Sequence, residues 1–283
     1  MKEKAWTMND WKAKNIGSSI PFPKIMGILN ATPDSFSGDG TLDHLELIDR
    51  GLSMLDQGAD ILDIGAESSR PFSIPIDEEE ERRRVLPVIK GLRKLTDAPL
   101  SIDTRRHRTA RAALDEGVDM INDITGLIDP DMRHLAAERS VGVIVMHMKG
   151  APENMQRAPV YADVLTEVKS FLRSRIDQAL KDGIAPDKLI VDPGIGFGKT
   201  LEHNLTLIRN LNRIRINNCP VLLGVSRKSM IGEILNLPVD ARIEGSLAAA
   251  AVGVLNGADI LRVHDVMETR RFFTVFHHMM RSA

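Results

Sequence analysis

Cysteine is almost absent from the chain, and this excludes two kinds of structure. Cys219 is the one cysteine among 283 residues, so the chain forms no internal disulfide and no cysteine-based zinc site. Because it stands beside Pro220 and an apolar run, we interpret Cys219 as a small buried residue. An excess of charge is missing as well. The formal net charge is −2, which gives no electrostatic reason to expect nucleic acid or an anionic membrane as a partner.

Long apolar runs are also missing. No segment reaches the length of a membrane-crossing helix, and the first residues include Lys2, Glu3 and Lys4, where a signal peptide would lead into an apolar core. We therefore expect a cytoplasmic protein. The composition is 43% hydrophobic and 27% charged, which is typical of a globular chain with a full core and does not indicate disorder.

What the sequence does contain is a repeated alternation of short apolar runs and longer amphipathic stretches. The runs are rich in Ile, Leu and Val, as expected of strands buried on both faces, and they cover 24–30, 60–65, 99–103, 119–124, 141–148, 188–192, 220–226 and 259–264. The helical stretches are 43–57, 77–95, 107–117, 131–139, 160–182, 202–216, 241–256 and 266–281. Eight such units predict an α/β fold, a (β/α)₈ TIM barrel.

The chain is predicted to form a single domain. No linker or low-complexity segment divides it, and the phrases "QGADILDIG", "EGVDMINDI" and "NGADILRVH" repeat one device, in which a helix ends, a glycine follows and a strand begins. Residues 24–283 therefore form the barrel. Residues 1–23 lie outside the repeat, and we expect this N-terminal extension to cover the closed base of the barrel.

Polar residues stand at nearly every predicted strand end, which is where a (β/α)₈ barrel carries its function. They are Asn30, Asp63, Asp103, Asn122, Asp123, His147, Asp192, Ser226, Arg227, Lys228, Arg262 and His264. A single residue of this kind is also typical of a helix cap or a loop anchor. A whole ring of such residues favours a binding site, because inward-pointing polar groups are costly without partners.

Several other sites are excluded by spacing. "DPGIGFGKT" ends like a phosphate-binding loop, but Pro193 occupies the position of that motif's first glycine, and the dinucleotide pattern fails at Lys199. We interpret these glycines as allowing close approach of the backbone to a flat ligand. Ser226 lacks the surroundings of a serine nucleophile, and the histidines lack zinc-site spacing.

Eight motifs in order resemble those of the dihydropteroate synthases. They are "MGILNATPDSFSGDG", "DIGAESSRP", "SIDT", "INDITG", "MHMKG", "DPGIGFGK", "SRKSMIG" and "RVHDV", and together they span residues 24–270. The resemblance implies the same barrel and an enzyme that joins 6-hydroxymethyl-7,8-dihydropterin pyrophosphate to 4-aminobenzoate. It also implies Mg²⁺ as a cofactor, a homodimer, and a sulfonamide target.

The resemblance assigns the polar residues to three parts of a site. Pterin-binding residues are Asp103, Asn122, Asp192, Lys228, Met146 and Gly224. Pyrophosphate-binding residues are Asn30, Arg70, Arg262 and His264, with Asn30 also a ligand of Mg²⁺. Aminobenzoate-binding residues are Ser69, Arg70, Pro71, Phe197, Lys228 and Ser229. The catalytic set is Asp103, Lys228, Arg262, His264 and Asn30.

The implied mechanism is dissociative. Pyrophosphate leaves first, the electron-rich pterin stabilises the methylene cation with Asp103 nearby, and the neutral aryl amine attacks the carbon. The chain departs from the family in one loop, where Phe72 replaces the usual glycine, and in the order of Ser37–Gly40. Phe72 is a loop residue that either varies freely or disfavours sulfonamides.

Two rival functions share the barrel. A pterin-dependent methyltransferase would use the same Asp and Asn positions but would not need Ser226–Lys228 beside Arg262 and His264. A pterin-binding barrel without catalysis is the second rival, and every residue expected for the chemistry is present.

Overall fold

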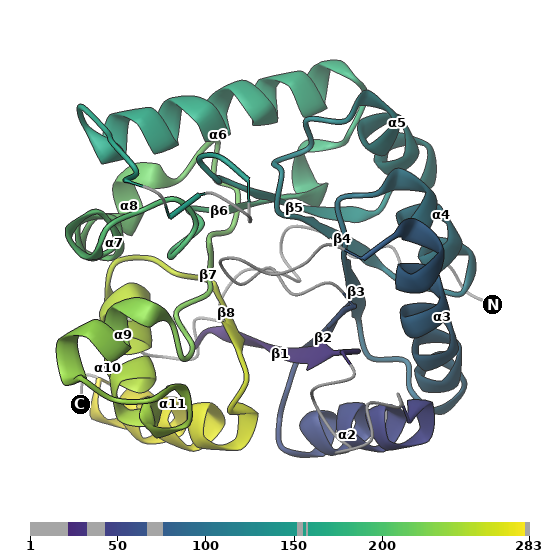
Figure 1. Ribbon diagram of the computed structural model, residues 1–283, viewed down its shortest axis with the longest axis horizontal. Helices are drawn as coiled ribbons and strands as arrows, with labels where there is room; N and C mark the ends of the chain where they lie inside the picture. Colours follow the sequence, from purple (N-terminus) through teal and green to yellow (C-terminus); the bar gives the residue numbers. More distant parts are fainter. Residues whose placement is uncertain (1–21, 33–42, 67–75, 152–154, 157, 281–283) are drawn as a thin grey trace.

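The eight predicted strands are all present and alternate with helices (Figure 1). A computed structural model describes residues 22–32, 43–66, 76–151, 155–156 and 158–280. The strands are β1 (Lys24–Asn30), β2 (Ile61–Gly65), β3 (Leu100–Asp103), β4 (Met120–Asp123), β5 (Gly142–Met146), β6 (Leu189–Asp192), β7 (Leu222–Leu223) and β8 (Ile260–Val263). Short, buried, β-branched runs form strands here because both faces of the sheet are covered.

The strands form one parallel sheet in the order β6-β5-β4-β3-β2-β1-β8-β7. A parallel bridge between Val191 and Val221 joins its two ends, so the sheet closes on itself. The fold is the (β/α)₈ barrel that the alternation predicts. All eight carboxyl ends therefore meet at one end of the barrel.

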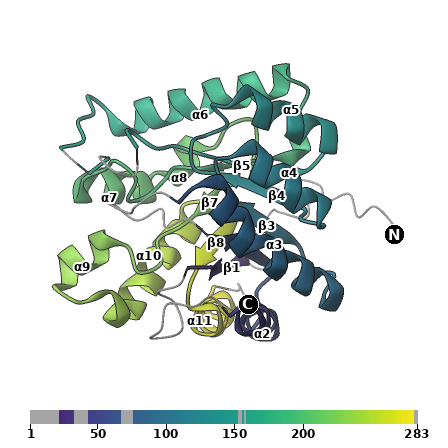
Figure 2. The same ribbon diagram turned by 45° about the vertical axis from the view of Figure 1, so that its right-hand side comes forward.

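Helices surround this barrel in both views (Figure 2). They are α2 (His44–Asp56), α3 (Glu78–Leu95), α4 (His107–Asp115), α5 (Pro130–Arg139), α6 (Val164–Lys181), α7 (Leu201–Arg209), α8 (Leu211–Ile214), α9 (Ser229–Leu235), α10 (Ile243–Leu255) and α11 (Val266–Met279). The single helix predicted over 202–216 is wrong in one respect, because Asn210 leaves the helical conformation at φ −130° and separates α7 from α8. Within the described residues, no helix is both long and apolar enough to cross a membrane.

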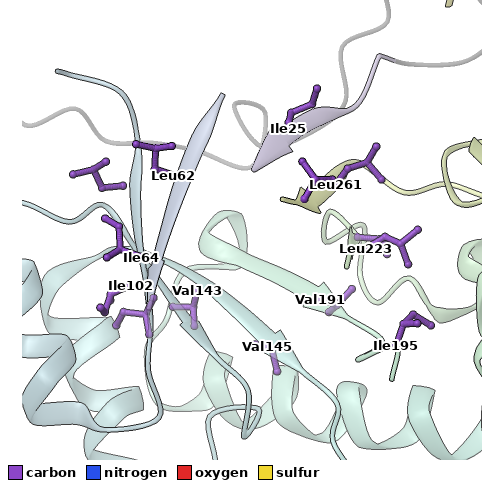
Figure 3. Close-up of a cluster of buried hydrophobic side chains, with 14 of the residues drawn as sticks. Ile25, Leu62, Ile64, Ile102, Val143, Val145, Val191, Ile195, Leu223 and Leu261 are labelled. Carbon is purple, nitrogen blue, oxygen red and sulfur yellow. The ribbon is translucent and has the colours of Figure 1, made fainter. Parts of the chain in front are cut away.

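Every strand except β3 contributes to two cores. Outward-facing residues such as Leu62, Ile102 and Val143 pack beneath the helices, and Figure 3 shows part of this cluster. Alternate residues point into the barrel and form a separate apolar floor, the cluster Met26, Ile61, Met120, Ile144, Ile190, Leu222 and Ile260. The floor fills the lower part of the barrel. Any site inside the barrel must therefore lie above it, toward the carboxyl ends of the strands.

The repeated glycine phrases form clamps at the opposite, amino-terminal end. Gly117 follows α4 with φ +100°, a conformation that favours glycine, and Asp119 precedes β4. The Asp119 carboxylate accepts a hydrogen bond from the backbone N–H of Leu100 at 3.0 Å and one from Arg93 at 2.8 Å. Arg93 also donates to the Gly117 carbonyl at 2.9 Å. The clamp thus ties one helix to two neighbouring strands.

The same clamp occurs before β2 and before β8. Asp60 accepts from the backbone N–H of Ile25 and from Arg270, both at 2.8 Å. Asp259 binds Arg215 at 2.7 Å in the same way. Each arginine also donates to the carbonyl of the glycine two residues before its aspartate. The repeat seen in the sequence is therefore a device for closing the base of the barrel.

The predicted N-terminal extension lies outside the described residues except for its last two. Phe22 packs against the core, and its ring lies 5.7 Å from that of His277 on α11. The chain therefore reaches β1 alongside α11. That residues 1–21 cover the barrel base stays a prediction.

Candidate active site

Five of the eight strands carry a polar side chain at the level above the apolar floor, namely β2, β3, β4, β6 and β8. Residues two apart on a strand point to the same face, so the positions above the floor also face the interior. They are Ile28, Asp63, Asn122, Met146, Asp192, Gly224 and Arg262, and Asp103 belongs to the same level on β3. A polar layer thus lies on an apolar floor at the carboxyl ends of the strands, where barrel enzymes carry their sites.

Arg262 is the centre of this layer. From β8 its Nε donates to Asp63 Oδ2 on β2, and its Nη2 donates to Asp103 Oδ2 on β3, both at 2.6 Å. Asn122 on β4 donates to the same Asp63 oxygen at 3.0 Å. Four strands are therefore joined by one network, and the prediction that Arg262 lies beside Asp103 is confirmed.

Burial and charge act against each other in this network. Burial raises the pKa of Asp103 to about 7, although the Arg262 guanidinium opposes the rise. Burial alone lowers the pKa of Arg262, but Asp63 and Asp103 outweigh it and hold the pKa above its usual value. The arginine stays charged, and the Asp103 carboxyl titrates near neutrality. A group that changes charge near neutral pH is typical of an active site.

Asp192 ends β6 on the same interior face and is buried. The backbone N–H of Gly194 donates to its Oδ1 at 2.7 Å, and burial raises its pKa. The turn that follows Asp192 carries Phe197, whose ring lies 4.2 Å from Lys228 Nζ. The acids and the lysine that the sequence assigns to the pterin, and the aromatic wall assigned to the second substrate, thus meet in one place.

The glycines of this turn have a different purpose from the one predicted. Gly194 has φ +66°, and a side chain on it would overlap the carbonyl oxygen of His147. A side chain on Gly198 would overlap the carbonyl oxygen of Lys149 in the same way. These two glycines let the loops after β5 and β6 pack backbone against backbone. Close approach to a flat ligand is not what requires them.

Gly224 is the glycine that leaves open space. It lies above Leu222 of the floor, and a Cβ built on it would meet only the Cβ of Arg262, at 4.0 Å. Met146 occupies the corresponding level of β5 and is buried. These are the two apolar positions assigned to the pterin, and both lie in the polar layer.

His264 follows β8 and contacts the loop after β7. Its Nδ1 lies 3.0 Å from Ser226 Oγ, which also accepts a hydrogen bond from the backbone N–H of His264 at 3.2 Å. Burial, followed by the positive charge of Arg262, lowers the pKa of His264 to about 3. The imidazole is therefore neutral at physiological pH.

The loop that carries Lys228 is fixed by hydrogen bonds from the neighbouring residue Arg227. Arg227, at φ +57°, donates from Nε to Asp265 at 3.0 Å, and its backbone N–H donates to Ser246 at 2.9 Å. Asp265 follows His264 directly and precedes α11. As predicted, a helix begins just after His264, and the short helix α9 begins at Ser229. The loops after β7 and β8 are therefore fixed to each other.

Two members of the predicted ring have structural roles instead. Asp123 accepts hydrogen bonds from the backbone N–H groups of Thr125 and Leu127, at 2.8 and 3.1 Å, and so anchors its own loop. His147 contacts Lys199, its Nδ1 lying 2.9 Å from Lys199 Nζ. Neither was assigned to a substrate.

The remaining residues assigned to the site either have no described contact with this network or lie outside the described residues. Asn30 ends β1, half-buried, on the strand between β2 and β8. The aminobenzoate residues Ser69, Arg70 and Pro71 lie outside the described residues, as do Phe72 and Ser37–Gly40. The network also includes Asp63, which the sequence placed in the ring but assigned to no ligand. The sequence could have indicated a role for Asp63, because this residue lies in a predicted strand directly before the motif "IGAESSRP".

A cluster of possible metal ligands lies away from the assigned site residues. Among the described residues, the single cluster of three carboxylate or imidazole ligands is His107, Asp129 and Asp131. Asp129 there already caps α5 through the backbone N–H of Asp131 and pairs with His107 at 2.9 Å. That cluster is accounted for by capping and involves none of the assigned site residues.

Comparison with known proteins agrees with this geometry. The model of a family described as pterin binding enzyme matches residues 26–264. The chain is 43% identical over 260 residues to dihydropteroate synthase of Escherichia coli strain K12, covering 91% of this chain and 92% of the relative. It is 44% identical over 268 residues to that of Haemophilus influenzae, covering 93% and 96%.

Solved structures show the same likeness. Dihydropteroate synthase of Xanthomonas albilineans with 4-aminobenzoic acid superposes with a TM-score of 0.87 at 42% identity, covering 92% of this chain and 94% of that one. That of Yersinia pestis with a sulfonamide drug complex gives a TM-score of 0.87 at 40% identity, covering 92% and 95%. The chain belongs to the dihydropteroate synthase family of pterin-binding enzymes.

Proposed function

We propose that this chain condenses 6-hydroxymethyl-7,8-dihydropterin pyrophosphate with 4-aminobenzoate, giving 7,8-dihydropteroate and pyrophosphate. The observation that carries the proposal is the network of Arg262 with Asp63 and Asp103, directly above the apolar floor. The Xanthomonas albilineans relatives bind 4-aminobenzoic acid in one structure and 7,8-dihydropteroate in another. These relatives do not favour the methyltransferase alternative.

The pterin would lie among the groups of the polar layer. Its aminopyrimidine edge presents adjacent donors and acceptors, which match the carboxylates of Asp103 and Asp192 and the amide of Asn122. Gly224 and Met146 would contact the faces of the ring, and the open space at Gly224 leaves room for a flat ligand. Buried carboxylates gain the partners that their burial demands.

The leaving group would be held by Arg262, His264 and Asn30. A guanidinium has five N–H groups, and the bonds to Asp63 and Asp103 engage two of them, so three can face phosphate oxygens. Ser226 Oγ accepts the backbone N–H of His264, so its own hydroxyl is available to donate to His264 Nδ1. The imidazole proton then sits on Nε2 and donates toward the pyrophosphate without any positive charge.

Carbon–oxygen cleavage would come first, leaving a methylene cation conjugated with the pterin. The Asp103 carboxylate would lie near this developing charge, and stabilising the charge would accelerate the step. The aryl amine, neutral at physiological pH, then attacks the carbon and loses its proton. Phe197 and Lys228 would position the ring of 4-aminobenzoate, with Ser229, Ser69, Arg70 and Pro71 completing that pocket.

Mg²⁺ is the proposed cofactor, with Asn30 as its protein ligand. An amide oxygen on the strand beside Arg262 fits a hard cation that shares its shell with phosphate oxygens. The bound ion would offset the negative charge of the departing pyrophosphate. Turnover should therefore require Mg²⁺ and stop on its chelation.

A homodimer through the last helices is the proposed assembly. Val252 and Leu255 on α10 and Val275 and Met279 on α11 are exposed apolar side chains. Light scattering should give twice the mass of the chain, and Val275→Glu should lower it. A monomer at all concentrations would contradict the assembly. A cytoplasmic location also remains a proposal.

The function is tested by incubating the purified protein with the pterin pyrophosphate, 4-aminobenzoate and Mg²⁺. Dihydropteroate and pyrophosphate should appear in equal amounts. Omitting 4-aminobenzoate should abolish dihydropteroate. Pterin binding with no product under any of these conditions would overturn the proposal.

A further inference from the structure

Lys199 is a buried charged residue to which no ligand has been assigned. It lies at the end of the turn between β6 and α7 and is 3% exposed. Its Nζ contacts His147 Nδ1 at 2.9 Å and donates to the carbonyls of Gly194 at 2.8 Å and Phe197 at 2.9 Å. The His147 carbonyl lies within 3.4 Å as well, so four acceptors surround an ammonium group that has three N–H donors. Lys199 therefore has no donor left for a substrate.

Keeping a lysine at this position is costly. Burial lowers the pKa of Lys199 to about 7, although Asp192 opposes the shift, and among the described residues it forms no salt bridge. Methionine would fill the same space without burying a charge. Packing alone therefore does not account for the residue. What a lysine adds is three hydrogen bonds that converge on one turn and one neighbouring imidazole.

The turn it holds has little freedom elsewhere. Gln156 donates to the Gly196 carbonyl at 2.8 Å, Tyr161 donates to the Gly198 carbonyl at 2.8 Å, and Asn204 accepts from the Gly196 N–H at 2.8 Å. Lys199 adds bonds to the carbonyl of Phe197 and to that of Gly194, which also accepts the backbone N–H of Phe197 at 3.1 Å. The backbone from Gly194 to Gly198 is thus fixed at nearly every residue.

The other side of the turn carries the groups assigned to substrates. The Gly194 N–H orients the Asp192 carboxylate at 2.7 Å, and the Phe197 ring lies 4.2 Å from Lys228 Nζ. A side chain on Gly196 would approach the Lys228 stem to 3.2 Å. A shift of the turn would therefore move Phe197 and Lys228 together. Asp103 and Asn122, on β3 and β4, would stay in place.

We propose that Lys199 is a positioning residue for the aminobenzoate half of the site, acting through the carbonyls of Gly194 and Phe197 on the placement of the Phe197 ring and Lys228. The inference rests on the proposed function and names the substrate that the turn governs. Its consequence is selective: loss of Lys199 impairs use of 4-aminobenzoate more than use of the pterin.

The test compares Lys199→Met, which has no donors, with Lys199→Gln, which keeps two. For Lys199→Met, kcat/KM for 4-aminobenzoate should fall about 10- to 100-fold, because small misplacements have effects of this size. Lys199→Gln should lie between Lys199→Met and the unaltered protein. The KM for the pterin pyrophosphate should change less than that for 4-aminobenzoate in both variants, because Asp103, Asn122 and Arg262 lie on strands outside the turn, although Asp192 and Lys228 adjoin it.

Lys188 provides a matched control. It is also a buried lysine, in η2 (Pro186–Lys188) at the opposite end of β6. Lys188→Met should lower thermal stability and leave both KM values unchanged. Should Lys199→Met leave the 4-aminobenzoate KM unchanged, or raise both KM values equally, the positioning role is refuted.

A second measurement does not depend on activity. In protein labelled with 4-fluorophenylalanine, the ¹⁹F resonance of Phe197 is assigned by its loss in Phe197→Leu. It should shift or broaden in Lys199→Met and stay unchanged in Lys188→Met. An unaltered resonance in Lys199→Met would overturn the inference even if the chain proved to make no dihydropteroate, which is the separate failure of the proposed function.

Discussion

The two ends of the barrel use the same pair of side chains, arginine and aspartate, for different purposes. At the amino-terminal end, Arg93 donates to Asp119 and also to the carbonyls of Gly117, Thr96 and Ala98, so its donors are nearly all engaged. At the carboxyl-terminal end, Arg262 donates to both Asp63 and Asp103, and these two bonds leave three of its five N–H groups for a ligand. A saturated pair contributes stability, whereas a pair with spare donors can also bind a ligand.

The two ends of the barrel also differ in the sequence: the clamp motif is repeated, whereas the residues of the polar layer follow no repeat. The clamps recur three times as Gly-x-Asp before a strand, because each closes the base of the barrel in the same way. The polar layer has no repeat, because each strand faces a different part of a substrate that has no symmetry. Repeated polar residues therefore indicate architecture in this chain, and unrepeated ones indicate chemistry.

The largest expected effect comes from breaking the shared pair. Arg262→Lys keeps the positive charge but loses the planar fork, so turnover should fall by about 10²–10³, comparable to the loss of one strong transition-state contact. Steady-state kinetics measure this effect, with thermal melting to confirm folding.

Arg93→Lys is the matched control at the other end of the barrel. It changes the same residue type in a saturated pair, so turnover should stay within about twofold while stability declines. If the two substitutions lowered turnover equally, the functional distinction between the ends of the barrel would be wrong.

Breaking a clamp should have the second largest effect, on stability. Asp119→Ala removes the acceptor of both Arg93 and the Leu100 N–H, so the free energy of unfolding should fall by about 2–3 kcal/mol. Denaturant unfolding measures the loss, and kcat should be unchanged under conditions where the protein stays folded. A decrease of less than about 0.5 kcal/mol in the free energy of unfolding would show that the clamp contributes little to stability.

Much of this division was accessible from sequence, because it depends on local patterns. Short buried runs identified all eight strands, and polar residues at their ends identified Asp103, Asn122, Asp192 and Arg262 as a group. The parallel order then places all strand ends together. No side-chain geometry was needed for these conclusions.

What remained hidden depends on contacts between distant segments. The pairing of Arg262 with Asp63 joins residues 199 positions apart. The sequence around Arg262 does not indicate which carboxylate its side chain will bind. Lys199 stood in a motif that resembled a phosphate-binding loop, and spacing excluded that motif without supplying another purpose. The break at Asn210 was missed because the apolar pattern continues through it.

A pH profile tests the charge state of the shared pair. Because burial raises the pKa of Asp103 to about 7, the carboxyl is mostly protonated below that pH and mostly ionised above it. The anion is the form that stabilises a developing cation, so turnover should rise with pH, being about tenfold lower at pH 6 than at pH 8.

Two variants identify the group responsible for this limb. Asp103→Asn should lower the plateau and remove the rise. Lys199→Met should keep it, which matters because burial lowers the pKa of Lys199 to about 7 as well. A rise that persists in Asp103→Asn would assign the limb to another group.

The smallest expected effect comes from the contact behind His264. Ser226→Ala removes the hydroxyl that lies 3.0 Å from Nδ1, so the imidazole loses the partner that favours the Nε2–H tautomer. Turnover should fall about threefold to tenfold, as expected for the loss of one hydrogen bond, and Ser226→Thr should restore it.

¹⁵N chemical shifts of the His264 imidazole report the tautomer directly. Because burial and Arg262 lower the pKa of His264 to about 3, the tautomer of the unaltered protein should not change between pH 5 and 9. An Nδ1–H signal in the unaltered protein would mean that His264 accepts from, and does not donate to, whatever lies above the polar layer.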